Sequence, residues 1–88
     1  MSDEAEEVRR VLDAIDALDE DGTPPEERAK RFGELLETSQ LAIRQKRQRA
    51  MRQMHDDGMS YRDIAARLGI SFGRVRQILA EDLSGPPK

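Results

Sequence analysis

Apolar residues recur at helical spacing along most of the chain and divide it into four segments. Residues 3–19 carry one apolar stripe at intervals of three and four, which predicts an amphipathic helix that ends before Gly22. Helical spacing returns over residues 24–55, and two shorter helical segments follow at 61–68 and 71–82. We therefore expect an all-α fold, with an N-terminal helical hairpin followed by a tri-helical region.

The last two segments carry capping residues at their ends. Ser60 and Ser71 are the predicted N-caps, because a serine oxygen accepts a hydrogen bond from a free backbone N–H at a helix start. Gly69 is predicted to end the first of these helices, since glycine adopts a positive φ without steric cost. Two helices joined by so short a turn form a helix-turn-helix pattern. The side chains predicted to pack between them are Ile64, Ala65, Leu68, Ile70, Val75, Ile78 and Leu79.

This stretch resembles the bipartite helix-turn-helix of bacterial transcription regulators. It is most similar to the fourth region of bacterial sigma factors and to response-regulator effector domains. The shared residues are Ser60, Ile64, Ala65, Leu68, Gly69, Ile70, Ser71, Val75 and Ile78. The resemblance implies that the outward positions of the second helix read DNA. Because neither a promoter-melting region nor a phosphoacceptor domain precedes the motif, we expect a small autonomous regulator, such as a repressor or an accessory factor.

Residues 24–55 fit either one long helix or two shorter ones. Thr23 is the predicted N-cap, and Pro24 and Pro25 suit a first helical turn, where a missing N–H costs nothing. Gly33 is a weak point, and a break near Thr38 and Ser39 stays open. The apolar side of the segment consists of Ala29, Phe32, Leu35, Leu36, Ile43, Ala50, Met51 and Met54.

Charge is distributed unevenly along the chain, whose net charge is −3. Residues 1–43 hold thirteen acids and five bases, a net charge of −8, whereas residues 44–88 hold five acids and ten bases, a net charge of +5. The basic part contains the helix-turn-helix pattern, which favours a phosphate-facing surface there. We therefore expect an acidic helical hairpin over residues 1–43, a DNA-binding region over 44–83 and a disordered tail over 84–88.

The last helix is the predicted reader of DNA sequence. Arginine can bond both acceptors of a guanine edge, glutamine can bond an adenine edge, and glycine lets the backbone approach the groove. The predicted base-reading residues are Phe72, Gly73, Arg74, Arg76 and Gln77. For Phe72, contact with a thymine methyl group and cover for the edge of the core remain alternatives.

Phosphate contacts are predicted for hydroxyl and basic side chains around this helix, since such contacts position a protein without reading sequence. They are Arg44, Lys46, Arg47, Arg49, Arg52, Ser60, Tyr61, Arg62, Arg67 and Ser71. For the basic run that begins at Arg44, a solvated helix face is the alternative interpretation.

A single helix-turn-helix reads few base pairs, so we expect a homodimer that binds double-stranded DNA. The predicted dimer interface consists of Val8, Val11, Leu12, Ile15, Leu18, Phe32, Leu35 and Leu36. A monomer whose first helix folds back on the helix-turn-helix core is the alternative. A second class of function is an adaptor or anti-factor that docks on RNA polymerase, a sigma factor or another regulator through its acidic helices.

Several classes of function lack the residues that they need. The sequence has no cysteine, which excludes disulfides and cysteine metal sites. The one histidine, His55, is interpreted as a helix-end residue rather than a metal ligand, because no second histidine accompanies it. Without a Gly-rich phosphate loop or a catalytic set, we expect neither an enzyme nor a cofactor. No apolar run is long enough to span a membrane and the N-terminus is acidic, so we expect a cytoplasmic, nucleoid-associated protein.

Overall fold

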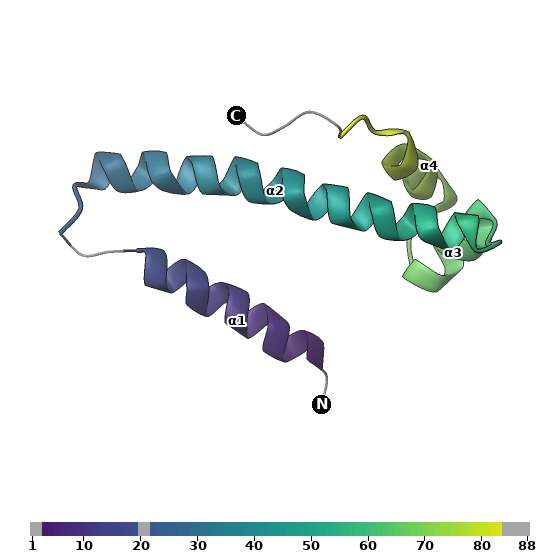
Figure 1. Ribbon diagram of the computed structural model, residues 1–88, viewed down its shortest axis with the longest axis horizontal. Coiled ribbons are helices and arrows are strands. Elements are labelled where there is room, and N and C mark those ends of the chain that lie inside the picture. Colours follow the sequence, from purple (N-terminus) through teal and green to yellow (C-terminus); the bar gives the residue numbers. More distant parts are fainter. Residues whose placement is uncertain (1–2, 20–21, 84–88) are drawn as a thin grey trace. The chain divides into compact units, whose positions relative to one another are not determined.

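The computed structural model describes residues 3–19 and 22–83, and within these ranges the secondary structure is four helices with no strand. They are α1 (Asp3–Leu18), α2 (Pro25–Asp56), α3 (Tyr61–Leu68) and α4 (Phe72–Ala80) (Figure 1). The predicted all-α fold, a helical hairpin followed by a tri-helical region, is confirmed. An N-cap at Ser2 and a disordered tail at 84–88 were also expected, but both fall outside the described residues.

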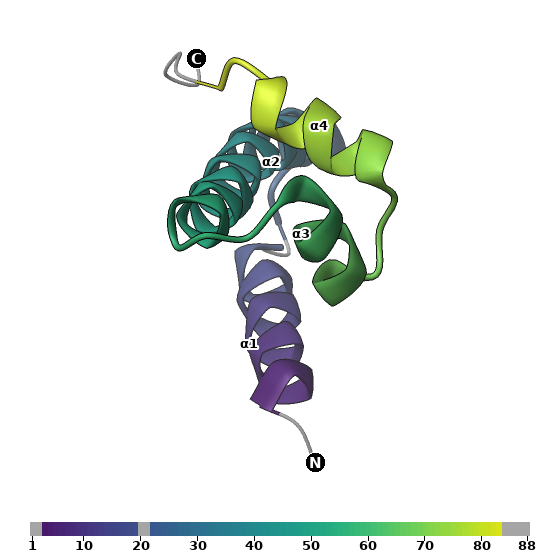
Figure 2. The ribbon, with the colours of Figure 1, turned by 90° about the vertical axis from the view of Figure 1, so that its right-hand side faces the viewer.

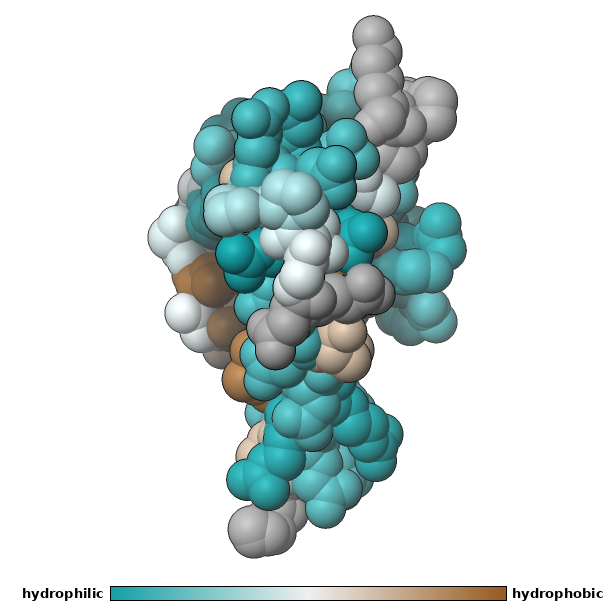
Figure 3. All heavy atoms as spheres, turned by 90° about the vertical axis from the view of Figure 1, so that its left-hand side faces the viewer, coloured by the Kyte–Doolittle hydropathy of each residue, from teal (hydrophilic) through white to brown (hydrophobic). Residues whose placement is uncertain are grey.

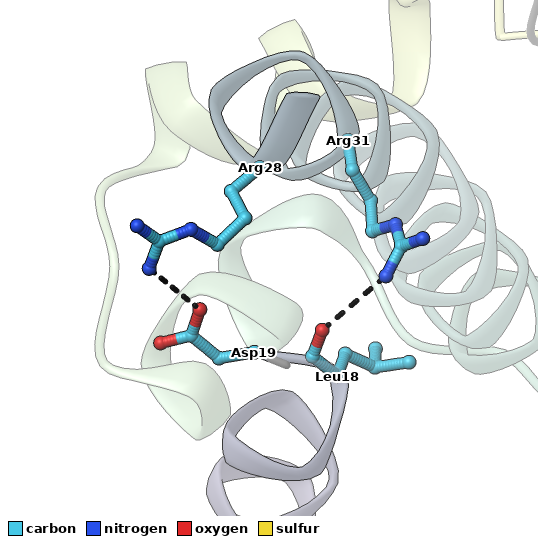
Figure 4. Close-up of polar contacts among 4 residues, drawn as sticks. All are labelled: Leu18, Asp19, Arg28 and Arg31. Atoms are coloured by element: carbon cyan, nitrogen blue, oxygen red, sulfur yellow. Dashed lines mark hydrogen bonds and ion pairs between the residues drawn. The ribbon is translucent and has the colours of Figure 1, made fainter. Parts of the chain in front are cut away.

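The chain divides into two compact units, Met1–Glu34 and Leu35–Lys88. In the first unit, two arginines from the start of α2 reach the C-terminal end of α1 (Figure 4). Arg28 Nη1 lies 3.7 Å from Asp19 Oδ1, and Arg31 Nη1 donates a 3.5 Å hydrogen bond to the Leu18 carbonyl oxygen. The last turn of α1 contains no base of its own. Arg28 and Arg31 therefore supply the positive charge that stabilises the negative end of a helix dipole.

No residue of α1 is buried in the described chain. Its apolar stripe is exposed along its whole length, from 58% at Val8 and Val11 to 42% at Leu18. Apolar side chains accordingly reach the surface among hydrophilic ones in the space-filling view (Figure 3). A helix of this length gains most of its stability from packing its apolar face. The stripe of α1 therefore lacks the cover that a stable amphipathic helix needs.

The segment after α1 is one uninterrupted helix of 32 residues, which settles the choice between one helix and two (Figure 1). Gly33 and the pair Thr38 and Ser39 lie inside it without a break. The predicted N-cap at Thr23 is wrong by one residue. The Arg28 N–H donates to the Pro24 carbonyl oxygen at 3.1 Å, which gives Pro24 the N-cap position.

The hydrophobic core lies in the second unit, where the C-terminal part of α2 meets α3 and α4 (Figure 2). Its buried members are Met51, Ile64, Ala65, Val75 and Ile78, and the partly buried side chains packed against them are Met54, Met59, Tyr61, Ile70 and Leu79. The core predicted for the helix-turn-helix is thus largely confirmed.

Leu68 and four residues of the predicted apolar side of α2 differ from the structure; in α2, Ala29, Leu36, Ile43 and Ala50 are exposed, Leu36 at 61% and Ile43 at 67%. Leu68 is 45% exposed rather than buried. It is the last residue of α3, one turn beyond the buried Ile64, and the core contact that follows is made by Ile70. Ala50 is exposed as well, because the inward positions of this part of α2 are taken by Gln48 and Met51.

Gln48 is the one buried polar side chain of the described chain, and it ties α2 to the end of α4. Its Nε2 donates to the carbonyl oxygens of Ile78 at 2.9 Å and of Glu81 at 2.7 Å. The last carbonyls of a helix lack their usual partners within the helix. The Ile78 carbonyl oxygen also accepts from the Glu81 N–H at 3.3 Å, so Gln48 adds a second hydrogen bond there and supplies a donor to the Glu81 carbonyl oxygen. Near it, Gln45 Nε2 donates to the Leu83 carbonyl oxygen at 2.5 Å. α4 itself ends at Ala80, two residues before the predicted Asp82.

Candidate nucleic-acid interface

The two serines predicted as N-caps both have that role. Ser60 Oγ accepts from the Asp63 N–H at 3.1 Å, and the Ser60 N–H donates to Asp63 Oδ2 at 3.1 Å, which makes a reciprocal capping box. Ser71 Oγ accepts from the Arg74 N–H at 3.0 Å. Both hydroxyl groups thus hold the starts of α3 and α4. The hydrogen bonds from the Ser60 backbone and side chain lower the pKa of Asp63 below its ordinary value, and the charge of Arg67 acts in the same direction.

The turn between α3 and α4 is set by Gly69. Its φ of 69° lies in the left-handed region that glycine adopts without strain. The Ile70 N–H donates to the Ala65 carbonyl oxygen at 3.1 Å, and the Ile70 side chain packs against the core. This C-cap and the Ser71 N-cap leave so little chain between the helices that α4 must cross α3 at a fixed angle (Figure 2).

Burial of Val75 and Ile78 defines the opposite face of α4, which is exposed. A shallow hollow lies on this face. It is lined by Tyr61, Gly73, Arg76, Gln77, Leu79 and Ala80. The two small residues Gly73 and Ala80 lie one above the other in the helix, and the polar side chains of Arg76 and Gln77 stand beside them. Such a face presents hydrogen-bonding groups at a place where a second surface can come close to the backbone.

The five predicted base-reading residues are all exposed and all lie in α4. Two of them are linked, because Arg74 Nη1 donates to Gln77 Oε1 at 3.2 Å. Phe72 is 38% exposed and lies outside the buried cluster. Its ring lies 6.4 Å from that of Tyr61, and the Arg62 and Arg76 guanidinium carbons lie 4.9 and 6.0 Å from its centroid. The predicted phosphate residues Arg62 and Arg67 are exposed on α3.

The basic run of α2 does not form a single face. Arg44, Lys46, Arg47, Arg49 and Arg52 are all exposed, but successive residues of a helix point about 100° apart. Lys46 therefore lies on the side of α2 away from Gln48. Arg49 and Arg52 line a groove at the end of α4, together with Glu81 and Asp82. The structure thus brings the α4 face, Arg62 and Tyr61 together, and distributes the basic run around α2.

The sequence analysis did not assign several contacts that the structure shows in this region. Asp63 completes the capping box, and it was recognisable from its position three residues after Ser60. His55 Nδ1 lies 2.8 Å from the Met59 carbonyl oxygen, and its ring meets that of Tyr61 edge-on at 4.9 Å. Gln45 and Gln48 lie inside a run of bases, which gave no hint of their contacts with α4.

The described residues contain no group of three or more side chains suited to hold a metal ion. None of the helices in the described ranges combines the length and the apolar character needed to cross a membrane.

Two short helices, α3 and α4, are joined by a glycine-capped turn and pack on the end of α2, and α4 has an exposed polar face. This arrangement defines a helix-turn-helix DNA-binding motif. Residues 46–81 match the family model of a helix-turn-helix domain, a stretch that covers less than half of the chain. Comparison with curated protein sequences gives no match, and neither does comparison with solved structures.

Proposed function

We propose that this chain is a sequence-specific, DNA-binding transcriptional regulator that acts in the bacterial cytoplasm, on the nucleoid, as a homodimer. The observation that carries the proposal is the exposed face of α4, where Arg76 and Gln77 flank the small residues Gly73 and Ala80. This face belongs to the part of the chain that carries a net charge of +5. The proposal includes neither an enzymatic activity nor a cofactor.

In this proposal α4 lies in the major groove, and its side chains contact different bases. Arg76 and Arg74 bond guanine edges, and Gln77 bonds an adenine edge. Gly73 allows the backbone of α4 to approach the base pairs. Arg62 and Arg67 of α3, with some of the bases of α2, contact phosphates and so fix the register of the protein on the duplex. The similarity to the fourth region of sigma factors supports the same outward positions on the second helix.

The experiment that tests DNA reading begins with selection of a preferred site from genomic fragments. Binding to that site is then measured by fluorescence anisotropy at several salt concentrations, because affinity falls steeply with salt when several phosphates are contacted. Arg76→Ala is expected to lose about 1–3 kcal/mol on the selected site and to relax the preference at one base pair. Arg9→Ala in α1 removes the same charge away from the motif and serves as the control. Equal loss on every sequence would show that Arg76 does not read bases.

The homodimer is supported by apolar side chains that the described chain leaves uncovered. They are the stripe of α1 and, in α2, Leu36, which is 61% exposed, next to the partly buried Phe32 and Leu35. A second copy that covers these side chains provides two reading helices for two half-sites. A monomer in which α1 packs on its own helix-turn-helix domain would provide only one reading helix.

Sedimentation of purified protein at tens of micromolar decides between the dimer and the monomer. Leu12→Glu, which places a charge in the α1 stripe, is expected to shift the protein toward monomer. Ala17→Glu introduces the same charge on the opposite side of α1 and is expected to leave the dimer intact. A wild-type chain that sediments as a monomer, or two variants that behave alike, would refute this interface.

A second candidate function is an adaptor or anti-factor, and the specific observation in its favour is again α1. An acidic helix with an exposed apolar stripe suits a basic groove on another protein as well as it suits a second copy. Binding to purified RNA polymerase or sigma factor that is lost in Leu12→Glu but kept in Arg76→Ala would favour the adaptor. Sequence-specific DNA binding that is lost in Arg76→Ala, with no binding of the wild type to polymerase or sigma factor, would favour the regulator.

A further inference from the structure

Phe72 is the first residue of α4, and arginines from both helices of the motif lie close to its ring. The guanidinium carbon of Arg62 in α3 lies 4.9 Å from the ring centroid, and that of Arg76 in α4 lies 6.0 Å from it. An arginine within about 6 Å of an aromatic centroid is attracted by the quadrupole of the ring. One half-exposed ring is therefore shared by a predicted phosphate contact and a predicted base reader.

The ring of Phe72 is braced from the side of the core. It lies 6.4 Å from the ring of Tyr61, which packs against the buried cluster and meets the ring of His55 at 4.9 Å. On α4, Phe72 and Arg76 are four residues apart and are thus neighbours on the helix surface. These contacts fix the position of the ring with respect to both arginines.

We propose that Phe72 is a positioning residue that holds Arg62 and Arg76 in place for DNA before DNA binds, an inference that rests on the proposed function. A free arginine side chain samples many rotamers, and ordering it on binding weakens the affinity. A ring that restrains both side chains in the free protein reduces this loss. Phe72 then contributes to recognition through the two arginines and does not itself touch a base.

Arg74 provides an internal comparison. It lies on the same helix, but its guanidinium group is held by the hydrogen bond to Gln77. Removal of the ring of Phe72 is therefore expected to release Arg62 and Arg76 and to leave Arg74 as it is. Because Phe72 lies outside the buried cluster, the substitutions that test this need not unfold the domain.

The first experiment uses the free protein and requires no DNA. Side-chain proton resonances of Arg62, Arg74 and Arg76 are compared by NMR in the wild type, in Phe72→Leu and in Phe72→Tyr. Loss of the ring current is expected to shift the signals of Arg62 and Arg76 in Phe72→Leu only, while those of Arg74 stay in place. Unchanged Arg62 and Arg76 signals in Phe72→Leu would overturn the proposal.

The second experiment measures affinity for the selected DNA site. Phe72→Leu is expected to weaken binding by about 3- to 10-fold, and Phe72→Tyr by less than about twofold. When Arg62 and Arg76 are both alanine, Phe72→Leu is expected to have almost no further effect, whereas in Arg74→Ala it keeps its full effect. The dependence on salt is expected to stay that of the wild type, since no phosphate-binding charge is removed.

Two outcomes of the affinity measurement are informative in different ways. A Phe72→Leu loss that persists without both arginines would show that Phe72 contacts a base directly and would overturn the positioning role. A wild-type chain that prefers no DNA sequence would refute the proposed function instead, and the NMR comparison would still decide whether the ring restrains the arginines.

Discussion

Gly73 is the residue at which stability and DNA binding are expected to oppose each other. It lies in the first turn of α4, and a Cβ built there meets nothing within 4 Å. Gly73→Ala is therefore expected to stabilise the domain by about 0.4–1 kcal/mol, because alanine loses less backbone freedom on folding. The same methyl group stands between the backbone and the groove, so affinity for the selected site is expected to fall.

The matched control for this change is Gly33→Ala in α2, where the space around the glycine is also open. Urea unfolding is expected to show a gain in both variants, and anisotropy a loss of DNA affinity in Gly73→Ala alone. Wild-type affinity in Gly73→Ala would argue against close approach of the backbone at this position.

Asp63 gives the start of α3 a dependence on pH. Its pKa is lowered in the folded protein by the hydrogen bonds from Ser60 and by Arg67. A carboxyl group whose pKa is lowered on folding stabilises the fold above its unfolded pKa of about 3.9, and this stabilisation is lost as pH falls through the folded value. Wild type is therefore expected to exceed Asp63→Asn in unfolding midpoint at pH 7, and the difference is expected to vanish at strongly acidic pH. A difference that stays constant with pH would contradict the role of the charge.

At this scale the sequence predicted the residues whose partners are local. Ser60, Gly69 and Ser71 bond groups within a few residues, so their chemistry alone identifies them. Gln48 was missed because its two partners are carbonyl groups 30 and 33 residues away, and a backbone carbonyl leaves no mark in a sequence. The shared ring of Phe72 was missed for the same reason, since its contact with Arg62 depends on how α3 and α4 cross.

At the scale of the elements, α2 and α4 are joined by a polar contact as well as by the core. Gln48→Ala is expected to cost about 1–3 kcal/mol, because it removes two hydrogen bonds of a buried side chain and leaves the Ile78 carbonyl oxygen with only the 3.3 Å bond from the Glu81 N–H. Gln53→Ala, at an exposed position of the same helix, is the control and is expected to change stability little. Equal unfolding free energies of the two variants in urea would show that this contact does not hold α4.

The helix boundaries were predicted well where caps mark them and less well elsewhere. α3 begins and ends where Ser60 and Gly69 predict. α4 stops earlier than expected because Glu81 takes an extended conformation, with φ −65° and ψ 137°, where Gln48 reaches its carbonyl group. Within α2, a glycine lowers helix stability by only about 1 kcal/mol relative to alanine, and no proline follows the first turn. The sequence therefore predicted neither a break in α2 nor its continuity.

At the scale of the whole molecule, the uneven charge was the strongest functional signal in the sequence. It separated the chain into an acidic part and a basic part that contains the helix-turn-helix. The surface that packs against the exposed stripe of α1 could not be identified from the sequence, because an apolar stripe shows that a partner surface is needed but not which one. The dimer therefore remains a proposal that must be tested on the intact chain.

The proposed dimer makes a prediction about the length of α2. Leu36 and the core contact Gln48 lie on the same continuous helix, so one alanine inserted between Ser39 and Gln40 turns them by about 100° relative to each other. A seven-residue helical insertion restores the face to within about 20° and adds about 10 Å. We expect the first variant to bind paired half-sites no better than a single one, and the second to prefer a different spacing. Selection from DNA libraries with variable spacers measures this, with an insertion between Gly22 and Thr23 as the control. An unchanged spacing preference in all variants would contradict it.

The continuity of α2 also bears on how such a protein would change its target sites. From Leu35 to Asp56 the helix has no proline and no glycine, the residues at which helices most often bend. In the proposed dimer, the number of residues in this part of α2 would therefore set the distance between its two ends. Changes on α4 would then alter which bases are read, and changes in the length of α2 would alter how far apart they are. The base sequence of a half-site and the distance between two half-sites would then depend on separate parts of one short chain.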